Sequence, residues 1–197
     1  MVRGLSVFAD NFVGFGDQYV IIGATACSLA LELRDLEFRI TKDIDMVLIV
    51  EALSSDFVRA FWDFIKAGGY NNRKRSSGSP QLYRFDNPSD TSYPQMIELF
   101  SRKPDILGEE YSGHLGPIPV EDELSSLSAI PLDEDYYNLI QHGRYNLDGL
   151  SRLKPEYLIV LKAEAWLDLK QQKLKGMDID SRDISKHKND VLRLSQI

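Results

Sequence analysis

The chain has 197 residues and a formal net charge of −7, with 43% hydrophobic and 27% charged residues. This composition predicts one globular domain, or one domain with a small annex, and excludes a largely disordered chain. The negative balance argues against nonspecific wrapping of a long nucleic acid, which needs many Lys and Arg contacts to phosphate. Cys27 is the only cysteine, and no secretory signal pattern or apolar run of about 20 residues is present, so we expect a cytoplasmic protein.

The first part of the chain is predicted to mix helices and strands. Hydrophobic periodicity predicts helices at 1–13 and 24–34 and strands at 19–22 and 44–50. The next helix should begin at a Ser54–Asp56 cap and end at Gly68-Gly69. A polar loop is expected at 71–80, followed by short strands near 82–85 and 95–100 and an irregular stretch at 103–131.

The last part of the chain is predicted to be helical. Pro155 suits the first position of a helix that continues to about Leu174, Gly176 interrupts it, and Ser181 begins a final helix. We therefore predict a mixed α/β (α+β) fold with a mixed sheet. Residues 1–150 would form the core, and residues 151–197 a helical part packed on it.

Two acids, Asp43 and Asp45, stand at the entry to the apolar strand. Alternation along a strand places both on one face, with Cα atoms roughly 6.5 Å apart. Such carboxylates can converge on a divalent cation, and their hard oxygens suit Mg²⁺. Glu98 lies between apolar residues of a later strand, where a shared metal ion would offset its burial. The alternatives are acids in an ordinary turn before a strand and a Glu98 that faces solvent on an edge strand.

A glycine turn precedes these acids. Gly23, Ala24 and Thr25 follow a short apolar run and open a helix, so their backbone amides could hold a phosphate, with a further contact from the Thr25 hydroxyl. The glycines of a dinucleotide fingerprint and the Gly-Lys-Ser/Thr of a Walker loop are absent. The alternative is a glycine that serves only a tight strand-to-helix turn.

Lys162 lies inside the apolar stripe of the helix that begins at Pro155. At 100° per residue, Leu158, Ala165 and Leu169 fall within roughly 60° of it. A buried lysine needs an anion to keep its charge, and a nucleoside triphosphate could supply it. The alternatives are a side chain that reaches past the stripe to water and a pair with an internal acid.

Together these features resemble the nucleotidyltransferase superfamily. That superfamily combines an apolar-Gly-Gly/Ser turn that opens a helix, an acid-apolar-acid strand and a third acid on a later strand. The matching residues here are Gly23, Asp43, Asp45 and Glu98, while Ala24 replaces the usual Gly or Ser. Within the superfamily, the Arg39-x-Thr41-x-Asp43 run is similar to the AbiEii-like group of abortive-infection and toxin-type enzymes.

The helical part extends the resemblance to the AbiEii-like group. That group carries a Lys on one helix and a Lys-Asp pattern on the next, which here match Lys162, Lys186, Lys188 and Asp190. Lys186 and Asp190 are four residues apart and could form a pair on one helical face.

The resemblance implies an enzyme that transfers a nucleoside monophosphate from an NTP to a hydroxyl acceptor. It implies Mg²⁺ on Asp43, Asp45 and Glu98, with Lys162 as a further catalytic residue. It also implies nucleotide binding by the residues that match the group's motifs, namely Gly23, Ala24, Thr25, Arg39, Thr41, Lys162, Lys186 and Asp190. The acceptor class, whether RNA, protein or small molecule, stays open. Two alternatives remain, a noncatalytic nucleotide-binding protein and the toxin of a toxin–antitoxin pair with an antitoxin-like partner.

Overall fold

The computed structural model describes residues 2–74, 80–102, 116–117 and 128–197. Their helices and strands form an α+β fold with a mixed sheet, which confirms the predicted fold class. The helices are α1 (Leu5–Phe12), α2 (Gly23–Glu32), α3 (Ser55–Gly68), α4 (Glu134–Gly143), α5 (Pro155–Leu174) and α6 (Ser181–Leu194), with a short 3₁₀ turn (Val13–Phe15) after α1. The strands are β1 (Tyr19–Ile22), β2 (Asp43–Leu48), β3 (Asn71–Lys74), β4 (Pro80–Asp86), β5 (Met96–Arg102), β6 (Gly116–Pro117), β7 (Ser128–Leu132), β8 (Arg144–Leu147) and β9 (Leu150–Leu153).

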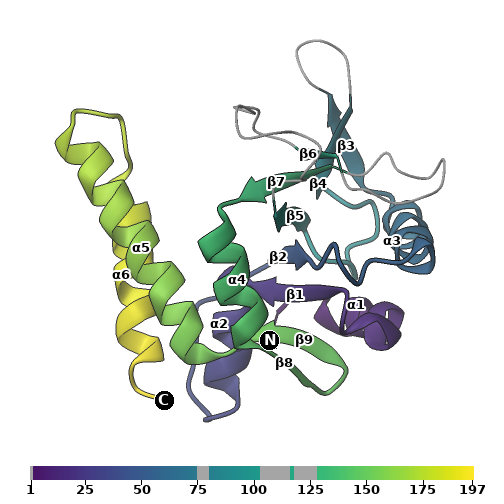
Figure 1. The fold of residues 1–197 in the computed structure, drawn as a ribbon, viewed down its shortest axis with the longest axis horizontal. Helices are drawn as coiled ribbons and strands as arrows, with labels where there is room; N and C mark the ends of the chain where they lie inside the picture. Colours follow the sequence, from purple (N-terminus) through teal and green to yellow (C-terminus); the bar gives the residue numbers. More distant parts are fainter. Residues whose placement is uncertain (1, 75–79, 103–115, 118–127) are drawn as a thin grey trace.

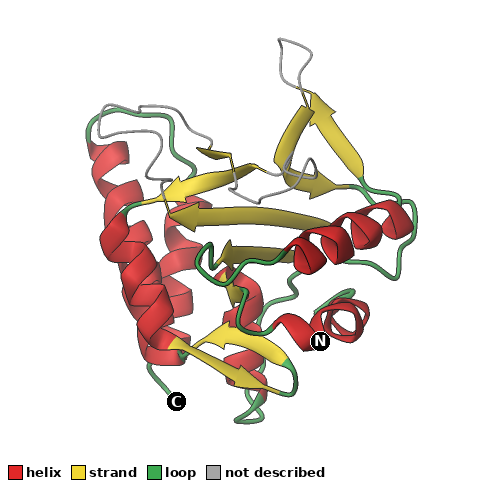
Figure 2. Ribbon diagram, turned by 45° about the vertical axis from the view of Figure 1, so that its right-hand side comes forward, coloured by secondary structure: helices red, strands yellow, loops and turns green. Residues whose placement is uncertain are grey.

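Strand β2 lies at the centre of the sheet, whose order is β3-β4-β5-β2-β1-β9-β8. It pairs with β1 in antiparallel and with β5 in parallel orientation, and β7 pairs with the far end of β5. β9 runs parallel to β1, so the sheet continues past residue 150. Figure 2 shows the β8–β9 hairpin at the lower edge of the sheet, next to the start of α5.

Buried and half-buried residues alternate along β5 and along the first half of β2. Ile44 and Met46 are fully buried, whereas Asp43 and Asp45 between them are half-buried. Helices α1 and α3 lie together on one side of the molecule (Figure 1), and their phenylalanines form one aromatic cluster with Tyr19 of β1. This packing fixes which face of β2 carries its acids.

Local signals in the sequence explain where the helices begin and end. The Ser54 hydroxyl accepts a hydrogen bond from the Phe57 amide at the start of α3, and Gly69 ends that helix in the left-handed conformation. Pro155 occupies the first turn of α5, and Asp180 caps α6. These predicted boundaries are confirmed. None of the described helices is both long enough and apolar enough to cross a membrane.

Helices α5 and α6 pack side by side, on the opposite side of the molecule from α1 and α3 (Figure 1). Both also contact α2, the helix that follows the glycine turn. The helical part of the chain therefore lies against the segment that carries Gly23.

Part of the expected organisation is wrong. Residues 71–74 form β3 and pair with β4, where a loop was expected, because the neighbouring strand satisfies their backbone groups. Helix α4 and the β8–β9 hairpin are additional elements. Most of the stretch at 103–131, expected to be irregular, lies outside the described residues.

Candidate active site

The three predicted acids share one face of two neighbouring strands. In the parallel pairing of β2 with β5, Asp45 lies opposite Glu98, and Asp43 lies opposite Met96. Residues paired across a parallel sheet point to the same side, and alternation adds Asp43 to that side. The register, which the sequence alone does not reveal, therefore brings the three acids to one face of the sheet, and their sharing of a metal ion stays a prediction.

Burial and mutual repulsion raise the pKa of these carboxylates and so disfavour their ionised forms. Burial raises the pKa of Asp45 to about 6, and the Glu98 carboxylate adds to this rise. Burial also raises the pKa of Asp43 and of Glu98. Cations act in the opposite direction, with Lys162 lowering the pKa of Asp45 and Arg84 that of Glu98. A bound cation would relieve the repulsion that remains.

The glycine turn lies against the Asp45 side chain. Gly23 is the first residue of α2 and adopts a φ of 69°, in the left-handed region that favours glycine. A Cβ at this position would collide with Oδ2 of Asp45. The sequence therefore needs glycine here for two reasons, its backbone conformation and the close approach of a carboxylate.

Thr25 ties the same turn to β2. Its buried hydroxyl donates a hydrogen bond of 2.6 Å to the backbone carbonyl of Asp43. This contact assigns Thr25 a structural part in holding the turn against the acid strand, in place of the phosphate contact expected for its hydroxyl. Ile22, which precedes the helix, makes no side-chain cap, so the first amides of α2 have no capping side chain.

Lys162 is buried, as its place in the apolar stripe predicts, with 8% of its surface exposed. Its Nζ lies 3.3 Å from Oδ2 of Asp190, so the alternative of an internal acid is the arrangement observed. Arg39 contacts the same carboxylate at 3.3 and 3.5 Å. Asp190, itself 2% exposed, thus joins α6 to α5 and to the segment before β2.

The expected pairing of Lys186 with Asp190 is wrong. Lys186 instead contacts Asp183, at 2.8 Å, because Asp190 turns inward toward Lys162 and Arg39. Lys186 is exposed at the protein surface, whereas Thr41 is buried just before β2. Of the predicted nucleotide-binding residues, Arg39 and Lys186 are therefore exposed, whereas the others are buried or half-buried.

Arg84 of β4 is a site residue that the sequence prediction missed. It lies opposite Glu98 in the antiparallel pairing of β4 with β5, and its guanidinium is 3.6 Å from the Glu98 carboxylate. The sequence signal that could have identified it is a cation that lies between Tyr83 and Phe85 in an alternating strand. Its partner could not be identified without the strand register.

The carboxylate oxygens of Asp43, Asp45 and Glu98 are of the kind that Mg²⁺ prefers, and the strand register places all three on one face. They are not yet arranged as a complete set of ligands. Among the described residues, no group of three or more His, Cys, Asp and Glu is arranged so that it could hold a metal ion as it stands. Arg84 draws the Glu98 carboxylate toward β4. A cation at this site would therefore compete with Arg84 for the Glu98 carboxylate.

No family model matches the chain, and no curated protein matches it. The interpretation of the site consequently depends on its own geometry and charges.

Proposed function

We propose that the protein is a Mg²⁺-dependent nucleotidyltransferase that moves a nucleoside monophosphate from an NTP to an acceptor hydroxyl and releases pyrophosphate. The observation that carries this proposal is the close approach of Gly23 to Asp45, which itself lies opposite Glu98. A helix end suited to phosphate and carboxylates suited to a divalent cation are thus neighbours. Reaction of an NTP needs both, a site for its phosphates and a divalent cation.

In the proposed reaction, the acceptor oxygen forms a bond to the α-phosphorus of the NTP. The bond from that phosphorus to the oxygen that bridges to the β-phosphate breaks, and pyrophosphate leaves. Glu98 accepts the proton of the acceptor hydroxyl, a role that its raised pKa supports. Asp43, Asp45 and Glu98 would hold Mg²⁺, which when bound stabilises negative charge on the phosphate oxygens.

Two further parts of the chain contribute to this reaction. The first amides of α2, from Gly23 onward, bind the β- and γ-phosphates. Lys162 neutralises negative charge that develops in the transition state, and it is close enough to lower the pKa of Asp45. Asp190 positions Lys162 through their ion pair, so its part in catalysis is indirect.

The test is incubation of the protein with each labelled NTP, Mg²⁺ and cell extract, followed by separation of RNA, protein and small molecules. We expect label in one fraction and release of pyrophosphate, both lost in Asp45→Asn. The control is Asp178→Asn, which removes the same formal charge at an exposed position and should leave transfer unchanged. Thermal unfolding with and without Mg²⁺ provides a second measurement, in which only wild type and the control should be stabilised.

Label that appears equally with wild type and Asp45→Asn would refute the assignment of the site. Absence of label with all four NTPs, together with no stabilisation by Mg²⁺, would refute the proposed activity itself.

A further inference from the structure

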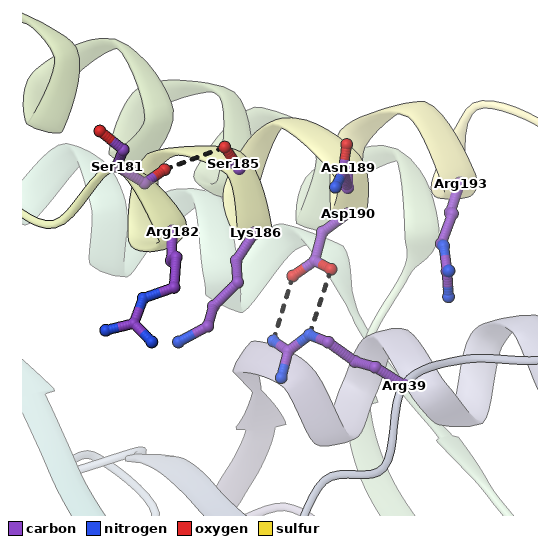
Figure 3. A pocket seen from close by; sticks show the side chains of 8 residues that line it. All are labelled: Arg39, Ser181, Arg182, Ser185, Lys186, Asn189, Asp190 and Arg193. Carbon is purple, nitrogen blue, oxygen red and sulfur yellow. Dashed lines mark hydrogen bonds and ion pairs between the residues drawn. The ribbon is translucent and has the colours of Figure 1, made fainter.

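A second charged site lies on α6, a different element from the strands β2 and β5 that carry the carboxylates. A cavity of about 330 Å³ opens between α6 and the segment that carries Arg39, and we name it the α6 pocket. Figure 3 shows the side chains of Arg182, Lys186 and Arg193 on the side of α6 that faces Arg39. Two serines, an asparagine and the buried Asp190 of α6 complete the lining.

The cations on α6 form a line along one side of the helix. Arg182, Lys186 and Arg193 are spaced by four and then seven residues, so at 100° per residue they fall within an arc of about 40°. At 1.5 Å per residue the line extends over about 16 Å. A single phosphate contacts about one helical turn, roughly 5.4 Å, and so cannot reach both ends.

Two of the guanidinium groups are held in place by an aromatic ring. The Cζ atoms of Arg39 and Arg193 lie 5.2 and 5.9 Å from the centre of the Phe38 ring. Arg193 also donates a hydrogen bond to the Glu37 carbonyl. A cation fixed in this way loses less side-chain entropy when it binds an anion than a freely moving lysine does.

The acids near the α6 pocket leave an excess of positive charge. Arg182 pairs with Asp180 and Lys186 with Asp183, both on the surface, where such pairs contribute little to stability and yield easily to a stronger anion. The buried Asp190 is shared by Arg39 and Lys162. Arg193 makes no salt bridge within the described part of the chain.

We propose that the α6 pocket binds a linear chain of phosphate groups, as found in single-stranded nucleic acid and in inorganic polyphosphate. Arginine predominates in the line, and its planar group suits bidentate contacts to phosphate oxygens. The length of the line favours several phosphates in succession over one compact anion. This site requires neither the proposed metal ion nor an NTP, so it goes beyond the proposed activity and can be tested without it.

The experiment measures binding of fluorescent single-stranded oligonucleotides of increasing length by anisotropy, in EDTA. Unlabelled polyphosphate, NTP and poly-glutamate serve as competitors. We expect affinity to rise with oligonucleotide length and to fall at least about tenfold in the double variant Arg182→Gln/Arg193→Gln. The dependence of log affinity on log salt should weaken by about 0.7 for each phosphate charge that the variant no longer neutralises. Lys188→Gln, on the same helix but about 100° or more from the line, should change affinity less than twofold.

Competition separates the two sources of the ligand, because polyphosphate competes if phosphate alone is recognised and fails if the sugar and base contribute. Either result supports a phosphate chain. Equal reductions in affinity in Lys188→Gln and the double variant would overturn the proposal, since they would indicate only a general charge effect. Competition by NTP or by poly-glutamate that is as strong as competition by an unlabelled long oligonucleotide would also overturn it. Asp45→Asn should bind normally, so failure of the proposed catalytic activity leaves this result unaffected.

Discussion

Replacement of Asp45 by Asn should stabilise the protein when no divalent cation is present. The folded state raises the pKa of this carboxyl from 3.8 to about 6, so ionisation of Asp45 at neutral pH opposes folding. A difference of about two pKa units corresponds to about 3 kcal/mol at most. Asparagine keeps the shape of the side chain without its charge, and it therefore removes this cost.

Because folding raises the pKa of Asp45, the gain in stability from Asp45→Asn depends on pH. Between pH 3.8 and about 6, the folded protein holds a proton at Asp45 that the unfolded chain has released, so wild-type stability falls as pH rises through this window. Above about pH 6, Asp45 is ionised in both states, and the full free-energy cost of its burial as a carboxylate is present. The advantage of Asp45→Asn should thus be small at pH 4 and reach its maximum, about 3 kcal/mol, at pH 7–8.

Thermal unfolding in EDTA measures this difference. For a chain of this size, 3 kcal/mol corresponds to a rise in Tm of about 6–12 °C at pH 8. Asp178→Asn controls for the change in net charge, because this residue is exposed. A gain in Tm that is the same at pH 4 and pH 8, or a decrease at pH 8, would show that Asp45 is not held in an unfavourable ionised state.

Three further predictions concern the turn, the buried ion pair and the thiol. Gly23→Ala should destabilise more than Gly176→Ala in urea unfolding, because both residues have positive φ but only the Cβ at Gly23 meets a carboxylate; equal destabilisation would contradict this reasoning. Asp190→Ala should cost about 3–5 kcal/mol by leaving Lys162 buried without its anion, and Lys162→Met in the same chain should recover part of this stability. Burial raises the pKa of Cys27 to about 12, so a thiol reagent at pH 8 should label it only after denaturant is added, and immediate labelling of the native protein would exclude such burial.

Much of the fold could be predicted because its signals are local. The Ser54 cap, Gly69 and Pro155 act within a few residues of their own position, and alternation in β2 assigned Asp43 and Asp45 to one face. The burial of Lys162 followed from its place in a helical stripe. These predictions required no knowledge of distant contacts.

The remaining features depend on pairs of residues far apart in the sequence. Arg39 and Asp190 are separated by 151 positions, and nothing near either residue identifies the other as its partner. The position of Arg84 beside Glu98 depends on the register between β4 and β5, which neither strand encodes alone. The α6 pocket forms between the line of cations on α6 and the segment around Phe38, which are brought together only when the chain folds.

The arrangement of ion pairs shows where a cation is most needed. Glu98 has Arg84 as its partner, and Asp190 has both Lys162 and Arg39. Within the described residues, neither Asp43 nor Asp45 forms a salt bridge, although Asp45 carries the larger rise in pKa. A sequence selected only for stability would replace such a carboxylate with a neutral side chain. Its presence beside Gly23 is therefore the strongest physical argument that this face binds a cation from solution.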